Sequence, residues 1–211
     1  GTGGANKNSI KIIGHAPDLY CQAYFVYDSK KSGGLTQSHL RFGKNPIRSP
    51  YLISSADFVA CHNPSYVRQY DMVKNLKDGG VFLLNCQWDM QGLGENLPAS
   101  MKRALAAKHA RFYTINAIDI ARNLGLGNRT NTILQASFFK LSGVIPIDQA
   151  VTEMKDAIYK SYFKKKGQAV VDMNNASIDH GLNELVEIQI PESWATAEDA
   201  PKEDNLSLIH I

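Results

Sequence analysis

Short apolar runs alternate with polar or glycine-containing loops along this chain, and the alternation constrains its fold more than any other feature. The runs that have the length and composition of strands are 19–27, 35–42, 56–61, 80–84 and 111–115. Stretches with helical spacing of apolar residues lie between the later runs. Apolar strands that alternate with helices are typical of a parallel sheet covered on both faces. The sequence therefore predicts a doubly wound α/β core.

The expected helices have clear boundary signals, with proline near a start and glycine after an end. They cover 64–76, 98–107, 117–124 and 129–141. After Pro146 the spacing is helical over 148–162 and 168–186, so a C-terminal helical segment follows the core. The run 35–42 alternates polar and apolar residues, which favours a hairpin-like or edge strand.

The length of 211 residues suits one sizeable α/β domain. We assign residues 1–195 to this domain and 196–205, which are acidic and contain proline, to a linker. The last segment, LSLIHI at 206–211, matches the translation of a sequencing adapter, so we interpret it as a non-native tail. The alternative for this tail is a short natural strand.

Composition argues against several classes of function. A net charge of +3 is too small to indicate nucleic-acid binding, and no run reaches the roughly 18 to 20 apolar residues of a membrane span. The three cysteines, Cys21, Cys61 and Cys86, lie far apart and without CxxC spacing. This pattern argues against a disulfide framework, and against a zinc or iron–sulfur site held by this chain alone. We expect buried free thiols, and no metal or catalytic residue in this chain.

The segment GTGGANK at residues 1–7 is a glycine-rich loop that opens a helical pattern. Such a loop offers unencumbered backbone N–H groups and a helix N-terminus, which together favour a phosphate. Loops of this type follow a β-strand, so we expect the chain to be part of a longer protein and to lack the first strand of its domain. The candidate ligands in this loop are Gly1, Thr2, Gly4, Asn6 and Lys7.

Other loops are expected at the same place, because ligands bind at the carboxyl ends of the strands of an open α/β sheet. The loop DSKKSGG after the run 19–27 supplies Lys30, Lys31 and Ser32 beside two glycines. Two loops rich in glycine and lysine at one edge predict an anion pocket. The alternative for each loop is an ordinary solvated turn.

Three further residues are weaker candidates. Asn128 is a ligand or a helix cap, with the cap favoured. Arg129 stands at an expected helix start, where a cation is disfavoured by the helix dipole, so it indicates an external anion or an acidic partner. His62 ends a strand; a general base is conceivable, but a hydrogen-bonded loop histidine is the favoured interpretation.

The chain resembles the gamma domain (domain III) of pyruvate:ferredoxin (flavodoxin) oxidoreductase, within the 2-oxoacid:ferredoxin oxidoreductase family. The resemblance runs from Gly1 to about Trp194, and the matching sequence motifs occur in the same order as in the family. These motifs include GTGGANKNSIKIIG, YFVYDSKKSGG, ADFVACHNPSY and GLGNRTNTILQASFFKL. The chain departs from the family at Gly3, where the family usually has valine, and at Phe163 in YFKKKG, where the family has YGKKG.

The resemblance implies a Rossmann-like fold and a role in a larger enzyme. The parent enzyme decarboxylates pyruvate on thiamine diphosphate and passes electrons through iron–sulfur clusters to ferredoxin or flavodoxin. It forms acetyl-CoA and CO2 with coenzyme A. Thiamine diphosphate, Mg and the clusters belong to other domains, whereas the gamma domain packs near the active site and is associated with coenzyme A.

The same resemblance implies the following expectations for partners and location. The partners are the other domains of the polypeptide and a second copy in a homodimer, in the cytoplasm or an anaerobic organelle, without nucleic acid or membrane. The isolated chain is expected to be inactive. Two other functions remain open at this stage. One is a free-standing dinucleotide-binding module that uses Asp28 for a ribose, and the other is an interdomain scaffold that binds no ligand.

Overall fold

The computed structural model describes residues 20–27, 36–43 and 56–201. The first two segments are the strands β1 (Tyr20–Tyr27) and β2 (Thr36–Gly43), which pair antiparallel from Tyr20 opposite Gly43 to Tyr27 opposite Thr36. The alternating run therefore forms a hairpin strand, as the sequence predicts. The two strands form their own sheet and do not join the parallel one.

The main sheet of the described residues has the order β3-β4-β5-β6. Its strands are β3 (Ala56–Cys61), β4 (Leu76–Asn85), β5 (Arg111–Ile115) and β6 (Val186–Ile188). The first three are parallel, and β6 joins β5 antiparallel. Cys61 lies opposite Leu84, and Asn85 lies opposite Ile115, so the carboxyl ends of three strands meet at one edge.

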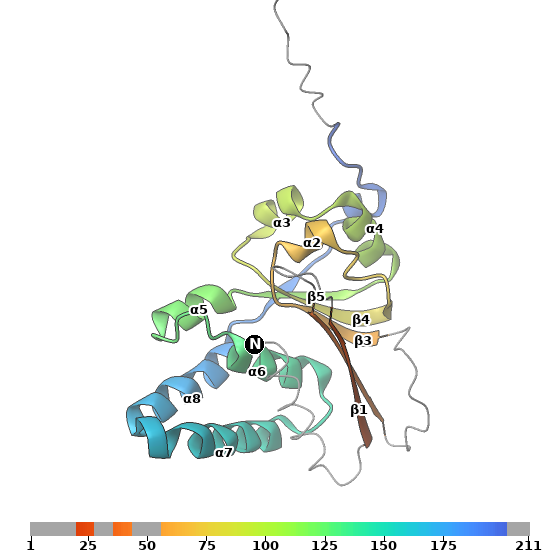
Figure 1. The fold of residues 1–211 in the computed structure, drawn as a ribbon. Coiled ribbons are helices and arrows are strands. Elements are labelled where there is room, and N and C mark those ends of the chain that lie inside the picture. Colours follow the sequence, from red (N-terminus) through yellow and green to blue (C-terminus); the bar gives the residue numbers. More distant parts are fainter. Residues whose placement is uncertain (1–19, 28–35, 44–55, 202–211) are drawn as a thin grey trace, which may run out of the picture.

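Helices cover both faces of this sheet (Figure 1). One face carries α2 (Tyr66–Gln69), α3 (Met90–Asn96), α4 (Ala99–Ala107) and the 3-10 helix η1 (Glu192–Thr196). The other face carries α5 (Ala117–Asn123), α6 (Asn131–Ser142), α7 (Ile147–Lys166) and α8 (Gln168–Asn183).

The alternation of side chains along β4 explains why both faces are covered. Phe82 and Leu84 pack into the cluster under α3 and α4, whereas Leu83 packs against α5 and α6. All three side chains are almost fully buried. A strand that is apolar on both sides requires a layer on each side, so the predicted α/β fold, doubly wound with a C-terminal helical segment, is confirmed.

Some boundaries differ from the prediction. The expected helix 64–76 is reduced to the single turn α2, because Leu76 already begins β4, opposite Ala56. The expected helix 129–141 begins only at Asn131, which leaves Arg129 outside it. Helix α3 and strand β6 were not expected: α3 contains two glycines, and β6 has only three residues.

Helices α6 and α8 make a close contact at Gly181, which is buried. A Cβ atom at this position would clash with the carbonyl oxygen of Ile133 and would lie 2.9 Å from the Cβ of Ala136. The Ser137 hydroxyl donates across the contact to the carbonyl oxygen of Gly181, at 2.7 Å. Only glycine allows the two backbones to approach this closely.

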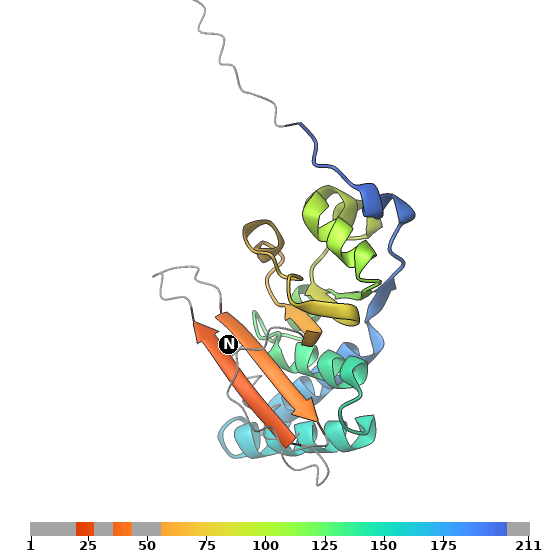
Figure 2. The ribbon, with the colours of Figure 1, turned by 90° about the vertical axis from the view of Figure 1, so that its right-hand side faces the viewer.

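The end of the described chain packs back on α4 (Figure 2). Trp194 is buried in the cluster under α3 and α4, with the Lys102 ammonium 5.9 Å from its ring centre. The Asp199 carboxylate accepts from the backbone N–H of Ala99 at 2.9 Å, and therefore caps α4 from a hundred residues away. The packed structure thus reaches into the segment 196–205 that the sequence assigns to a linker.

Candidate functional site

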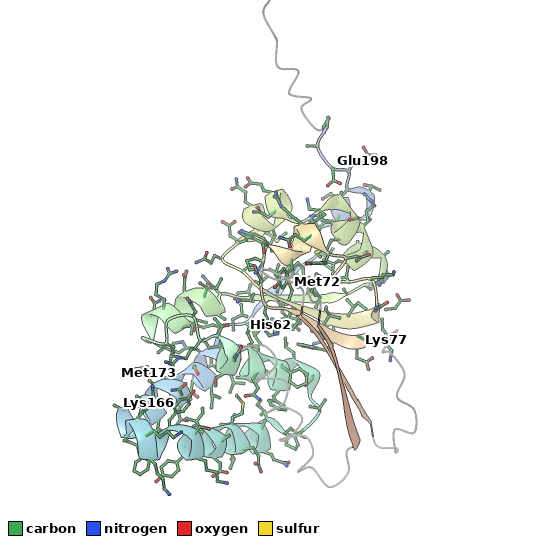
Figure 3. The ribbon with its side chains drawn as sticks, viewed as in Figure 1. His62, Met72, Lys77, Lys166, Met173 and Glu198 are labelled. Carbon is green, nitrogen blue, oxygen red and sulfur yellow. The ribbon has the colours of Figure 1, made fainter. Side chains whose placement is uncertain are left out.

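A cleft of about 250 Å³ lies at the carboxyl edge of the sheet, where α5 and α6 meet β3 and β4. Its lining residues are His62, Asn63, Pro64, Asn85, Ile118, Arg122, Gly127, Asn128 and Thr130. The lining comes from loops and helix ends that are far apart in sequence. Figure 3 places His62 at the junction between the sheet and the helices of the α5–α8 face. The position is the one that open α/β sheets use for ligands.

Asn85 holds the floor of the cleft together. Its side chain is buried, its amide nitrogen donates to the carbonyl oxygen of His62 at 3.0 Å, and its amide oxygen accepts from the N–H of Ala117 at 3.0 Å. One side chain therefore joins the end of β3 to the start of α5. Because both of its polar atoms are used, Asn85 shapes the cleft and has little capacity left for a ligand.

His62 brings an uncharged imidazole to the cleft. Burial lowers the pKa of His62 from 6.5 to about 4. The ring is therefore neutral at pH 7 and offers one hydrogen-bond donor and one acceptor. A base with so low a pKa is poorly matched to proton transfer at neutral pH. The favoured interpretation, a hydrogen-bonding loop histidine, fits this environment better than a general base.

The loop after His62 is folded into a tight turn. The side-chain oxygen of Asn63 accepts from the backbone N–H of Ser65 at 3.0 Å and from its hydroxyl at 2.8 Å. A residue that precedes proline is also restricted towards extended backbone. The wall of the cleft at Asn63 and Pro64 is thus set by local chain geometry.

Arg122 supplies a cation to the opposite wall. Its guanidinium lies 3.4 Å from the Asp119 carboxylate, and its side chain is 69% exposed. Asp119 also accepts from the side chains of Asn116 at 2.7 Å and Gln87 at 2.8 Å. These hydrogen bonds, Asn116 first and Gln87 second, lower the pKa of Asp119, so the carboxylate stays charged and orients Arg122.

The start of α6 forms the third side of the cleft. Thr130 is the N-cap residue, and its side chain makes no capping hydrogen bond. Asn116, in contrast, caps α5 by accepting from the N–H of Asp119 at 3.1 Å. The start of α6 therefore has more capacity for an anionic ligand than the start of α5.

The loop between α5 and α6 brings one predicted residue to the cleft. Asn128 lines it, and Gly127 before it has φ +61°, a conformation that favours glycine. Arg129 is exposed and follows Asn128, but it is not among the lining residues; its backbone N–H donates to Leu126 at 3.2 Å. The other predicted ligands lie outside the described residues. These are Gly1, Thr2, Gly4, Asn6, Lys7, Lys30, Lys31 and Ser32.

Sequence reasoning missed Arg122 and Thr130 as parts of the site. Both belong to helix ends that reach the cleft only because α5 and α6 pack on the same face of the sheet. The signal available for Arg122 was its place as a basic residue in the last turn of the short helix that precedes GLGNR. Asn85, in contrast, stands at the strand end that the sequence places at this edge.

Cys61 and Cys86 are buried and free, as expected. Burial raises the pKa of the Cys61 thiol to about 12 and also raises the pKa of Cys86. Both side chains belong to the apolar cluster under α3 and α4. They are therefore packing residues.

Metal-ligand clusters and membrane spans are both absent from residues 20–27, 36–43 and 56–201. Histidine, cysteine, aspartate and glutamate form no group of three or more there that could hold a metal ion. None of the helices in these ranges is long and apolar enough to cross a membrane.

Comparison with known families gives a match over residues 1–184 to the model of pyruvate ferredoxin/flavodoxin oxidoreductase. The chain is 56% identical over 199 residues to pyruvate:ferredoxin oxidoreductase of Moorella thermoacetica, and 55% identical to pyruvate-flavodoxin oxidoreductase of Enterobacter agglomerans. Each alignment covers 94% of this chain but 17% of the relative. The chain thus corresponds to about a sixth of these relatives.

Solved structures share the fold at low sequence identity. The subunit PORC of pyruvate oxidoreductase from Thermotoga maritima superposes with a TM-score of 0.69 at 18% identity, over 90% of this chain and 92% of that one. A 2-oxoglutarate:ferredoxin oxidoreductase from Magnetococcus marinus, solved with 2-oxoglutarate, coenzyme A and succinyl-CoA bound, gives a TM-score of 0.59 at 15% identity. That match covers 93% of this chain and 29% of the other.

Proposed function

The chain belongs to the pyruvate ferredoxin/flavodoxin oxidoreductase family, and we propose that it is the gamma domain that binds coenzyme A in such an enzyme. The whole enzyme then converts pyruvate and coenzyme A to acetyl-CoA and CO2 and reduces ferredoxin or flavodoxin. We place thiamine diphosphate, its Mg ion and the iron–sulfur clusters on the other domains. This chain contributes no group to the chemical step.

The observation that carries this proposal is the cleft at the carboxyl edge of the sheet. Coenzyme A has a pyrophosphate and a 3′-phosphate, so its site needs cations and N–H donors. Arg122 is exposed there and paired with Asp119, and Thr130 is the N-cap residue of the 12-residue helix α6 at the same place. A planar guanidinium binds two phosphate oxygens at once, and a helix N-terminus favours an anion.

The described part of the cleft is close to neutral, because the charge of Asp119 offsets that of Arg122. Tight binding of a phosphate therefore needs further cations. We propose that the loops 1–7 and 30–34 supply them through Lys7, Lys30 and Lys31, since the sequence places both loops at strand ends. His62, neutral and half-buried, then serves as a hydrogen-bonding group beside the ligand.

Full-length enzyme with Arg122→Gln tests the described half of this site. One charge-assisted hydrogen bond is worth about 1.5 to 3 kcal/mol, so the KM for coenzyme A should rise at least about tenfold. The matched control is Arg111→Gln: Arg111 is also exposed but begins β5, at the other end of that strand. It should leave the KM unchanged.

The loop lysines are tested by Lys30→Ala combined with Lys31→Ala. Removing both ammonium groups from the phosphates should raise the KM for coenzyme A about a hundredfold. Reduction of the enzyme by pyruvate without coenzyme A, followed in a single turnover, should remain nearly normal. If this first half-reaction fails in a folded variant, these lysines serve another site. An unchanged KM with lower stability supports a scaffold without a ligand.

A further inference from the structure

The C-terminal half of α7 has two aromatic side chains that are exposed and stacked. The rings of Tyr159 and Phe163 lie 4.6 Å apart with 17° between their planes. Tyr159 is 47% exposed and Phe163 is 39% exposed. Of the other exposed large apolar side chains of the described chain, Met90 and Val186 belong to other elements, and Ile147 stands at the opposite end of α7.

Lysines surround this aromatic pair. Lys164, Lys165 and Lys166 follow directly and are exposed, and they form no ion pair within the described ranges. Lys160 lies between the two aromatic residues and pairs with Asp156 at 2.8 Å. We call residues 159–166 the α7 surface; its net charge is positive.

Helix stability alone explains only part of this pattern. Lysines in a last turn interact favourably with the helix dipole, and a charged outer face is ordinary for a surface helix. Neither reason accounts for two large aromatic side chains in water. Aromatic residues surrounded by charged residues match the anatomy of protein interfaces, which have an apolar centre and a polar rim.

The position of α7 shows that the surface faces outwards. Its other side, with Ala150, Met154 and Ile158, packs in the cluster formed with α6 and α8. Figure 1 shows α7 as the helix farthest from the sheet on its side of the molecule. Nothing in the described part of the chain covers the aromatic pair.

We propose that the α7 surface docks on an acidic, partly apolar surface of another domain of the same enzyme. The inference uses the family membership but not the coenzyme A site. Because this chain corresponds to 17% of the length of its relatives, most of the enzyme lies outside it and is available for this contact. The lysines select an acidic partner, and the stacked rings supply the apolar area that the contact buries.

Zero-length cross-linking of the full-length enzyme tests the proposal. A carbodiimide joins lysine amines to carboxylates in direct contact, and mass spectrometry identifies the linked residues. Lys164, Lys165 or Lys166 should link to aspartate or glutamate outside the 211 residues, within one polypeptide. The yield should fall about fivefold in about 1 M salt, where the Debye length is about 3 Å. The Lys160–Asp156 pair is the internal positive control, and exposed Lys74 is the negative control.

A variant separates docking from simple exposure of the lysines. Tyr159→Ser with Phe163→Ser should lower the yield of these links at least about fivefold, because the apolar centre of the contact is removed. Met90→Ser, which changes another exposed apolar side chain, should not alter it. The KM for coenzyme A should be unchanged in both variants, so the test is independent of the proposed coenzyme A site.

Three results would overturn the proposal. One is a link yield for Lys164–Lys166 no higher than for Lys74. Another is links that join two copies of the enzyme, which assigns the surface to a dimer. The last is links that form only after ferredoxin or flavodoxin is added, which assigns it to the electron carrier.

Discussion

Two regions of the molecule differ in how completely their polar side chains are engaged in contacts. One is the contact between α6 and α8, and the other is the cleft at the sheet edge. At the helix contact, the Ser137 hydroxyl donates to the carbonyl oxygen of Gly181 at 2.7 Å, and a Cβ atom at Gly181 would have no room. At the cleft, Asn85 is equally saturated, but Arg122 beside it remains largely exposed. The helix contact fixes the fold, whereas the cleft keeps polar groups available.

A change in the helix contact should therefore affect mainly stability, whereas a change at an exposed residue of the cleft should affect mainly binding. In the helix contact, backbone approaches backbone, so added volume has no room. In the cleft, the lining side chains come from separate elements. Substituting one polar residue therefore removes contacts on one side of the cleft only.

The largest expected loss of stability comes from Gly181→Ala. The added Cβ meets the carbonyl oxygen of Ile133 and the Cβ of Ala136, so α6 and α8 must separate. We expect the free energy of unfolding to fall by about 3 kcal/mol or more, measured by urea denaturation. The control is Gly94→Ala in α3, where no atom lies within 4 Å of the new Cβ. It should be neutral or stabilising by up to about 1 kcal/mol. An equal loss in both variants would refute the close helix contact.

The next largest effect is expected from Asn85→Ala. The change leaves the His62 carbonyl oxygen and the Ala117 N–H without their partner in a buried place. The free energy of unfolding should fall by about 2 to 4 kcal/mol in the same assay. Stability and ligand affinity should fall together here, in contrast to Arg122→Gln, where only affinity should change. A stable Asn85→Ala protein would show that the cleft does not depend on this residue.

A smaller effect, dependent on pH, is expected from His62. Its pKa of about 4 in the folded chain lies below the ordinary value of 6.5. The unfolded chain therefore binds a proton below pH 6.5 that the folded chain does not. Stability is fully present above pH 6.5 and falls as the pH drops towards 4, by up to about 3 kcal/mol. Urea unfolding at several pH values measures this slope, and the slope should be reduced in His62→Gln. Parallel curves for the two proteins would contradict the lowered pKa of His62 in the folded chain.

The smallest effect is expected from Asp156→Asn on α7. Its ion pair with Lys160 is exposed on both sides, and such pairs contribute little. The urea midpoint should not change measurably. The same substitution should raise the cross-linking of Lys160 to residues outside the chain, because the α7 surface becomes more positive. A clear loss of stability would show that this surface is already ordered by its own charges.

Two strands of the parallel sheet were predicted with their observed bounds. The runs 56–61 and 111–115 match β3 and β5, because each is a short apolar run that ends in polar residues. The run 80–84 covers only the buried half of β4, because residues 77–79 at its start are exposed. The expected helix 64–76 was wrong, since the pairing of Leu76 opposite Ala56 overrides the local helical pattern. Strand β6 gave no signal, because Val186 and Glu187 are exposed and its place depends on β5.

The candidate site was predictable only in outline. The rule that ligands bind at the carboxyl ends of strands points to the sheet edge where the cleft lies, and Asn128, predicted as a ligand or helix cap, is among the lining residues. Arg122 and Thr130 could not be found in this way, because the packing of α5 against α6 brings them together. The roles of Lys7, Lys30 and Lys31 stay predictions, since they lie outside the described residues.

The cap that Asp199 places on α4 has a consequence for synthesis on the ribosome. Chains emerge N-terminus first, so the N–H of Ala99 waits through a hundred further residues for its acceptor. Trp194, which closes the apolar cluster around Phe112, emerges equally late. Until that segment has been made, Phe112 lacks the contact with Trp194. Residues 194–199 therefore complete the packing on this face of the sheet, and translation that stops before them leaves the face open.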